Sequence, residues 1–85
     1  MSLREILQKM LEWIVQEQEK ATKPGGEPFI YTSLTYCASQ AGAGEQLGEV
    51  VKLLQTTAKA EGGTTDAVRP FRAIFLINRT LAILV

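Results

Sequence analysis

The sequence predicts a small all-α protein, a bundle of about four helices that forms a single domain over residues 1–85. Three observations support this prediction. Apolar residues recur every three or four positions over most of the chain, which is the period of a helix with one buried face. Glycine-containing breaks at residues 23–28, 42–44 and 61–65 divide the chain into four segments. Each break is short, as connections within one compact domain usually are.

The first segment has the clearest helical pattern. Ser2 followed by Glu5 forms a capping box, in which the hydroxyl accepts a backbone amide and the carboxylate accepts the amide of the serine. The segment turns polar on all sides after residue 15 and ends before Pro24. Its apolar face consists of Leu3, Ile6, Leu7, Met10, Leu11 and Ile14, and Trp13 widens this face.

The second segment, residues 29–41, admits two interpretations. Its apolar residues at helical spacing form one face, and Pro28 suits the first turn of a helix. Residues 30–36, however, are rich in the β-branched and aromatic residues that favour strands. We prefer the helix, because only the C-terminal segment could pair with a strand here. The alternative is an α+β fold with strands near residues 30–36 and 73–84.

The third segment is predicted to be a helix over residues 45–60. Glu45 and Glu49 lie in its first turns and Lys59 lies near its end, charges that match the helix dipole. Gly62 follows at the place where a glycine often takes the left-handed conformation that ends a helix. The apolar face consists of Leu47, Val50, Val51, Leu54 and Ala58.

The fourth segment is predicted to be a helix from about Asp66 to Val85, with Pro70 in its first turn and Thr65 or Asp66 as its cap. Unlike the other segments it is apolar on two sides, and such a helix packs on two sides. Because three shorter helices cover it only partly, we expect its apolar residues to form an interface with another protein surface. The expected interface residues are Phe71, Ile74, Phe75, Ile77, Leu81 and Leu84.

The size and composition of the chain favour completion of the core by oligomerisation. A core of 85 residues is thin, and small domains often depend on disulfides, metals or association. The single cysteine, Cys37, excludes an internal disulfide, and the absence of histidine excludes a Cys/His zinc site. We therefore expect a homo-oligomer or a complex with a larger protein. The net charge of zero makes self-association easier and gives no long-range attraction to nucleic acid.

Three arginines are the most conspicuous charged feature. Arg69, Arg72 and Arg79 fall near one edge of the fourth helix, where they could contact phosphates or the carboxylates of a partner. We prefer a structural interpretation, in which Arg72 and Arg79 pair with acidic residues of the chain itself. The candidate acidic residues are Glu5, Glu12 and Glu49.

Two further features resemble parts of a cofactor site or an active site, but the surrounding sequence does not support either function. The glycines of residues 42–48 differ by one residue in spacing from a dinucleotide-binding fingerprint, and Glu45 occupies the place that a phosphate would take. A chain this short also cannot complete a dinucleotide-binding sheet. Cys37 has apolar neighbours and no histidine to act as its base, so we predict a buried core residue. We predict no catalytic residue, no cofactor and no metal.

Together these observations predict a non-enzymatic structural or protein–protein interaction module that self-associates, most simply as a homodimer, through its apolar C-terminal segment. The alternative is a small dimeric nucleic-acid-binding regulator that uses Arg69, Arg72 and Arg79. The chain shows neither an apolar run long enough to span a bilayer nor a signal-peptide pattern. We therefore expect a cytoplasmic protein without a membrane partner.

Overall fold

The computed structural model describes residues 1–84. Within these residues the chain forms four α-helices and one 3₁₀ turn, so the prediction of a small all-α bundle is confirmed. The alternative with strands near residues 30–36 and 73–84 is wrong. The pairing between Thr32 and Val68 is an isolated antiparallel bridge, and residues 73–83 are helical. The elements are α1 (Leu3–Thr22), α2 (Leu34–Gln40), η1 (Gly44–Gln46), α3 (Leu47–Ala60) and α4 (Pro70–Ile83).

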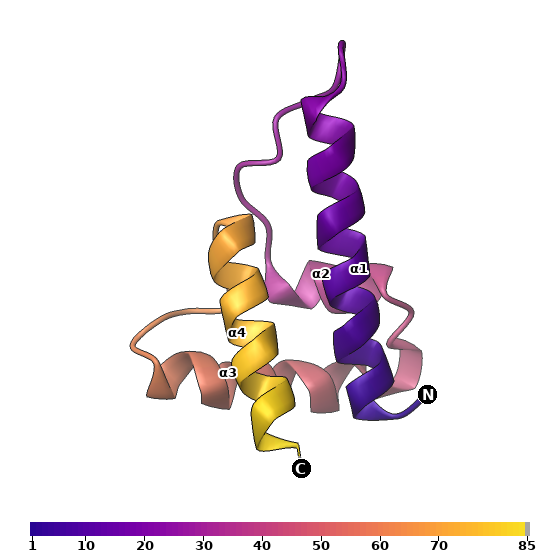
Figure 1. The fold of residues 1–85 in the computed structure, drawn as a ribbon. Helices are drawn as coiled ribbons and strands as arrows, with labels where there is room; N and C mark the ends of the chain where they lie inside the picture. Colours follow the sequence, from indigo (N-terminus) through magenta and orange to yellow (C-terminus); the bar gives the residue numbers. More distant parts are fainter. Residues whose placement is uncertain (85) are drawn as a thin grey trace.

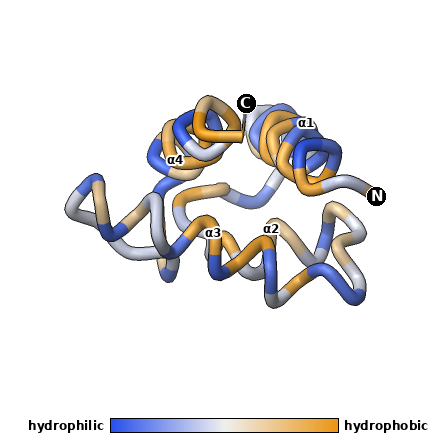
Figure 2. The backbone as a smooth tube through the Cα atoms, turned by 90° about the horizontal axis from the view of Figure 1, so that it is seen from below, coloured by the Kyte–Doolittle hydropathy of each residue, from blue (hydrophilic) through white to orange (hydrophobic). Residues whose placement is uncertain are grey.

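The helices are arranged in two layers (Figures 1 and 2). α1 and α4 lie side by side and antiparallel in one layer, and α2 and α3 cross behind them in the other. The guanidinium of Arg4 joins the beginning of α1 to the end of α4, since its Nη2 donates to the carbonyl oxygens of Leu84 (2.6 Å) and Leu81 (3.4 Å). The beginning of α1 and the end of α4 therefore lie at the same end of the molecule.

Local signals set the helix ends as the sequence predicts. The capping box is present: the amide of Glu5 donates to Ser2 Oγ (3.1 Å), and the amide of Ser2 donates to Glu5 Oε1 (3.2 Å). α2 and α3 both end with a glycine in the left-handed region, Gly42 at φ 83° and Gly62 at φ 73°. At each end two amides close a Schellman motif, by donating to the carbonyl oxygens of Ser39 and Ala38 after α2, and of Lys59 and Ala58 after α3.

Two helices are shorter than predicted. The second helix begins at Leu34, because Ser33 caps it by accepting the amide of Tyr36 (3.0 Å). The preceding residues are extended, and the bridge between Thr32 and Val68 holds them. The fourth helix begins at Pro70 and not at Asp66, because a residue before proline is disfavoured in the helical conformation.

Aromatic rings hold α2 and the extended segment before it against α1. The indole of Trp13 makes edge-on contacts with Phe29 and Tyr36, with ring centroids 5.8 and 5.6 Å apart. Such pairs stabilise a packed surface by about 0.5–1.5 kcal/mol beyond the area they bury. This segment therefore stays on the bundle without forming a helix.

The hydrophobic core lies between the two layers. It includes one hydroxyl pair, in which Thr80 Oγ1 lies 2.8 Å from Thr57 Oγ1 and 2.8 Å from the carbonyl oxygen of Leu76. Because these buried hydroxyls are hydrogen-bonded, they do not carry the cost of an unpaired polar group. Fully buried side chains of the core include Ile6, Leu7, Met10, Ile14, Leu34, Cys37, Val50, Leu54, Leu76 and Ile77. Among residues 1–84, none of the helices combines the length and the apolar character that crossing a membrane requires.

Candidate protein-interaction surface

Apolar side chains gather on the side of α1 and α4 that is turned away from α2 and α3. Phe71 is 82% exposed, and Phe75, one turn later on α4, is 37% exposed. Ile74 lies partly buried beside them. α1 contributes Val15, which is 45% exposed, and the partly buried Leu11. We call these five residues the outer face; they are Leu11, Val15, Phe71, Ile74 and Phe75.

The outer face follows from how the two layers bury each helix. The side of α4 that carries Ala73, Leu76 and Ile77 packs into the core. Residues four apart lie on the same side of a helix, so Phe71 and Phe75 project together from the opposite side. Phe71 and Phe75 together form an exposed apolar patch, a kind of surface that is typical of protein contact sites.

The structure divides the predicted interface residues among three places. Phe71, Ile74 and Phe75 lie on the outer face. Ile77 is fully buried in the core, because α4 is turned so that this side meets the other helices, and it is not accessible to a partner. Leu81 is partly buried against the core, and Leu84 lies at the end of α4.

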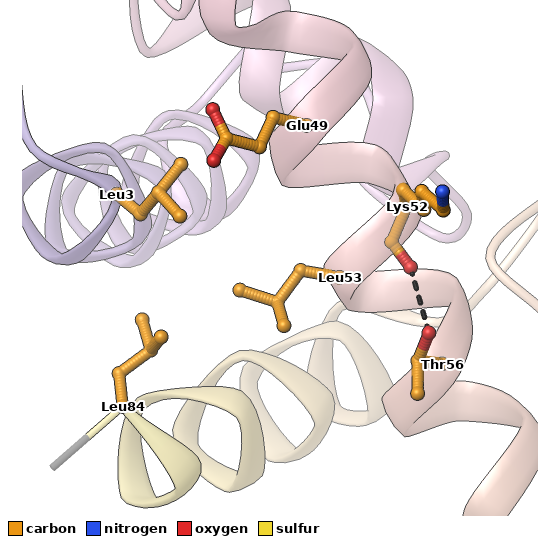
Figure 3. Close-up of a pocket in the computed structure, with 6 residues that line it drawn as sticks. All are labelled: Leu3, Glu49, Lys52, Leu53, Thr56 and Leu84. Carbon is orange, nitrogen blue, oxygen red and sulfur yellow. Dashed lines mark hydrogen bonds between the residues drawn. The ribbon is translucent and has the colours of Figure 1, made fainter.

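Leu84 lines a shallow hollow of about 260 Å³ at the end of the bundle where α1 begins and α4 ends. Figure 3 shows Leu3, Leu53 and Leu84 pointing into it from α1, α3 and the end of α4. At its rim Thr56 Oγ1 donates to the carbonyl oxygen of Lys52 (3.0 Å), so that hydroxyl is engaged within α3. The hollow can accept an apolar side chain, and it offers few polar groups to orient a small molecule.

On α1, Leu11 and Val15 form a flat apolar patch with Glu12, Gln16 and Glu19 around it. Sequence analysis missed Val15, which lies outside the predicted buried face. The signal was present, because Leu11 and Val15 are four residues apart and so extend an apolar stripe around the helix.

Each arginine of the predicted edge has a contact within the chain. Arg79 Nε donates to Glu61 Oε1 (3.1 Å), and Arg72 Nη2 donates to the carbonyl oxygen of Glu61 (3.0 Å). The guanidinium of Arg72 also lies 4.9 Å from the ring centre of Phe75. The expectation of pairing with an acidic residue is correct for Arg79, although its partner is Glu61 and not one of the predicted residues. Arg72 instead binds a backbone carbonyl and forms no ion pair within residues 1–84. Glu61 is the partner because the turn after α3 brings it beside α4.

Arg69 lies apart from the other two arginines. It precedes α4 in extended conformation, and its guanidinium lies 5.4 Å from the ring centre of Tyr31 in the segment before α2. Arg72 and Arg79 therefore share one edge of α4, whereas Arg69 belongs to the connection that pairs with residues 29–33. The three do not form a continuous basic strip.

Cys37 takes the structural role that the sequence predicts. It is fully buried, and its Sγ lies 3.4 Å from Thr32 Oγ1. Burial raises the pKa of the Cys37 thiol above its ordinary value, which disfavours the thiolate needed for nucleophilic or metal chemistry. In the part of the chain that the structure describes, no group of three or more cysteine, aspartate or glutamate residues is placed to hold a metal ion.

The glycine loop also has a structural explanation. Gly42 ends α2, and Gly44 at φ 54° opens the 3₁₀ turn before α3. Glu45 is exposed within that turn.

No protein-family model, curated protein or solved structure shows significant similarity to this chain.

Proposed function

We propose that this protein is a non-enzymatic interaction module that self-associates through the outer face of α1 and α4. The observation that carries the proposal is the exposure of Phe71, with Phe75 and Val15 beside it on the same side of the layer. Burying a phenylalanine side chain stabilises a complex by roughly 1.5–3 kcal/mol. In a two-fold dimer every such residue counts twice, because the same surface is used by both copies.

Two properties of the chain as a whole support self-association. Its net charge of zero produces little long-range repulsion between copies. A small domain buries a smaller fraction of its surface on folding than a large one, so apolar surface buried in an interface adds proportionally more to its stability. The same surface would also suit a larger protein partner. The free, buried thiol of Cys37 is consistent with a reducing, cytoplasmic location.

The alternative, a dimeric nucleic-acid-binding regulator, has less support. It requires Arg69, Arg72 and Arg79 to face phosphates together, whereas Arg69 lies on Tyr31, apart from the edge of α4 that carries Arg72 and Arg79. A fluorescence-anisotropy titration with duplex and single-stranded oligonucleotides at low salt separates the two functions. Binding that weakens steeply with salt would favour the alternative.

The proposal is tested by the mass of the protein in solution. Light scattering over a concentration series should show a dimer that dissociates on dilution, and Phe71→Asp should shift the mass to that of the monomer. Gln55→Asp is the control, because Gln55 is exposed on α3, in the layer behind the outer face. A monomer at every concentration, or equal dissociation by both variants, would contradict the proposal.

A further inference from the structure

We propose that the occupant of the outer face is a second copy of this chain, docked so that α4 of each copy lies antiparallel on α1 of the other. The inference rests on the proposed self-association and specifies its geometry. A two-fold axis parallel to the helices, between the two copies, produces this arrangement. The four helices α1 and α4 would then form one central bundle, with α2 and α3 of each copy on its outside.

Both helices contribute an exposed apolar side chain to this contact, Val15 on α1 and Phe71 on α4. Arg4 donates to the carbonyl oxygens of Leu81 and Leu84, which fixes the register of the two antiparallel helices. Val15 follows Arg4 by eleven residues on α1, and Phe71 precedes the two carbonyls by ten and thirteen residues on α4, so Val15 and Phe71 lie at about the same level. A rotation about an axis parallel to the helices preserves these levels. Phe71 of the second copy is therefore brought to Val15.

The charges beside these apolar residues are complementary. Glu5, Glu12 and Glu19 recur every seven residues along one edge of α1, and Arg72 and Arg79 are seven residues apart along one edge of α4. Seven residues span about 10.5 Å of helix, so the two rows have the same spacing. Placing α1 on α4 of the second copy brings an acidic row beside an arginine row on both sides of the dimer. Placing α1 on α1 would oppose like charges.

The contacts within the monomer leave both arginines able to bind a further carboxylate. Nε of Arg79 donates to the carboxylate of Glu61, and Nη2 of Arg72 donates to the backbone carbonyl oxygen of Glu61. A guanidinium has five N–H donors, so several remain on each side chain. Glu12 and Glu19 are exposed beside Leu11 and Val15 on α1, where the arginines of the second copy would arrive with its phenylalanines.

Charge reversal of one row at a time tests the geometry. The acidic-row variant is Glu12→Lys with Glu19→Lys, and the arginine-row variant is Arg72→Glu with Arg79→Glu. Each variant alone should raise the dissociation constant of the dimer at least about tenfold, and an equimolar mixture should restore it. Sedimentation equilibrium gives these constants, and circular dichroism checks folding. Raising the salt concentration should weaken the wild-type dimer.

The outcomes separate this inference from the proposed function. A wild-type chain that stays monomeric would overturn the self-association itself. A wild-type dimer whose dissociation constant is unchanged by the acidic-row variant would overturn the pairing of α1 with α4 while leaving self-association intact. The acidic-row variant is decisive even if the arginine-row variant does not fold, because Glu12 and Glu19 make no hydrogen bond or ion pair through their side chains in the structure of residues 1–84.

Disulfide cross-linking provides an independent measurement. Gln8 and Asn78 are both exposed. Gln8 follows Arg4 by four residues on α1, and Asn78 precedes the two carbonyls that Arg4 binds by three and six residues on α4, so the two positions lie at about the same level. A mixture of Gln8→Cys and Asn78→Cys chains should form an interchain disulfide on oxidation, while Gln8→Cys alone should not. The buried Cys37 does not compete. Faster cross-linking of Gln8→Cys alone than of the mixture would show α1 lying on α1 and overturn the inference.

Discussion

Two glycines at the two ends of α3 are expected to respond to the same substitution with opposite signs. Gly62 follows the helix at φ 73°, in the left-handed region that residues with a side chain rarely adopt. Gly48 lies in the first turn of α3, is exposed, and has open space where a Cβ would be. Alanine at Gly62 therefore strains the backbone, whereas alanine at Gly48 only favours the helix.

The magnitudes follow from the backbone conformations. A left-handed alanine costs about 1–2 kcal/mol, and the loss of glycine's freedom in the unfolded chain offsets about 0.4–1 kcal/mol of that cost. Gly62→Ala should thus lower the free energy of unfolding by about 1 kcal/mol. Gly48→Ala should raise it by about 0.5–1 kcal/mol, the difference in helix propensity between the two residues. The two variants should differ by roughly 1.5–2 kcal/mol, or about 6–16 °C in melting temperature for a domain of this size.

Urea denaturation followed by circular dichroism, at one fixed protein concentration, measures both variants. Neither glycine lies on the outer face, so association affects both measurements equally. The slope of the free energy against urea should match the wild type, which shows that the substitutions act on the native helix ends. A neutral or stabilising effect of Gly62→Ala would refute the Schellman ending that the structure gives to α3.

Three further predictions concern buried and capping groups. Thr80→Val removes a buried hydrogen bond and should lower the free energy of unfolding by about 1 kcal/mol, while Thr56→Val, whose hydroxyl is exposed, should change it little; urea denaturation measures both. Because the pKa of the Cys37 thiol is raised in the folded state, the native protein holds this proton when the unfolded chain releases it. Stability should therefore fall as the pH rises above the ordinary thiol value of about 8.5, and Cys37→Ala should show a smaller fall over the same window. The amide and hydroxyl of Ser2 lower the pKa of Glu5, so the capping box should stabilise the protein above the ordinary glutamate value of about 4.3 and be lost as the pH falls through the lower folded value. A Glu5→Gln variant that shows the same acid dependence as the wild type in thermal melts would contradict this.

The parts of the fold that local chemistry determines were predictable from the sequence. The capping box at Ser2 and the glycine after α3 each act within a few residues, and the structure has both. The apolar period of the first segment predicted the buried side of α1, including Ile6 and Met10. Such features need no knowledge of what lies elsewhere in the chain.

The parts that distant contacts determine were not predictable. Residues 29–33 are extended because Val68 pairs with Thr32. No local sequence pattern predicts a pairing between residues so far apart in the chain. Ile77 was assigned to an interface because periodicity alone cannot say which of two apolar sides of α4 meets the core. The pairing of Arg79 with Glu61 depends on how the turn after α3 returns to α4.

The contact between Arg4 and the end of α4 bears on how the protein folds. It joins the first turn of α1 to the end of α4, so complete pairing of these two helices closes nearly the whole described chain into a loop. Contacts between neighbours in sequence, such as α2 with α3, carry a smaller closure entropy and should form earlier. A circular permutant that links the original ends and opens the chain within the exposed residues 24–27 would make the α1–α4 contact local. It would also separate α1 from α2 in sequence, and α1 packs on α2 as extensively as on α4. We therefore expect that permutant to keep the native structure and to fold at a rate close to that of the original chain.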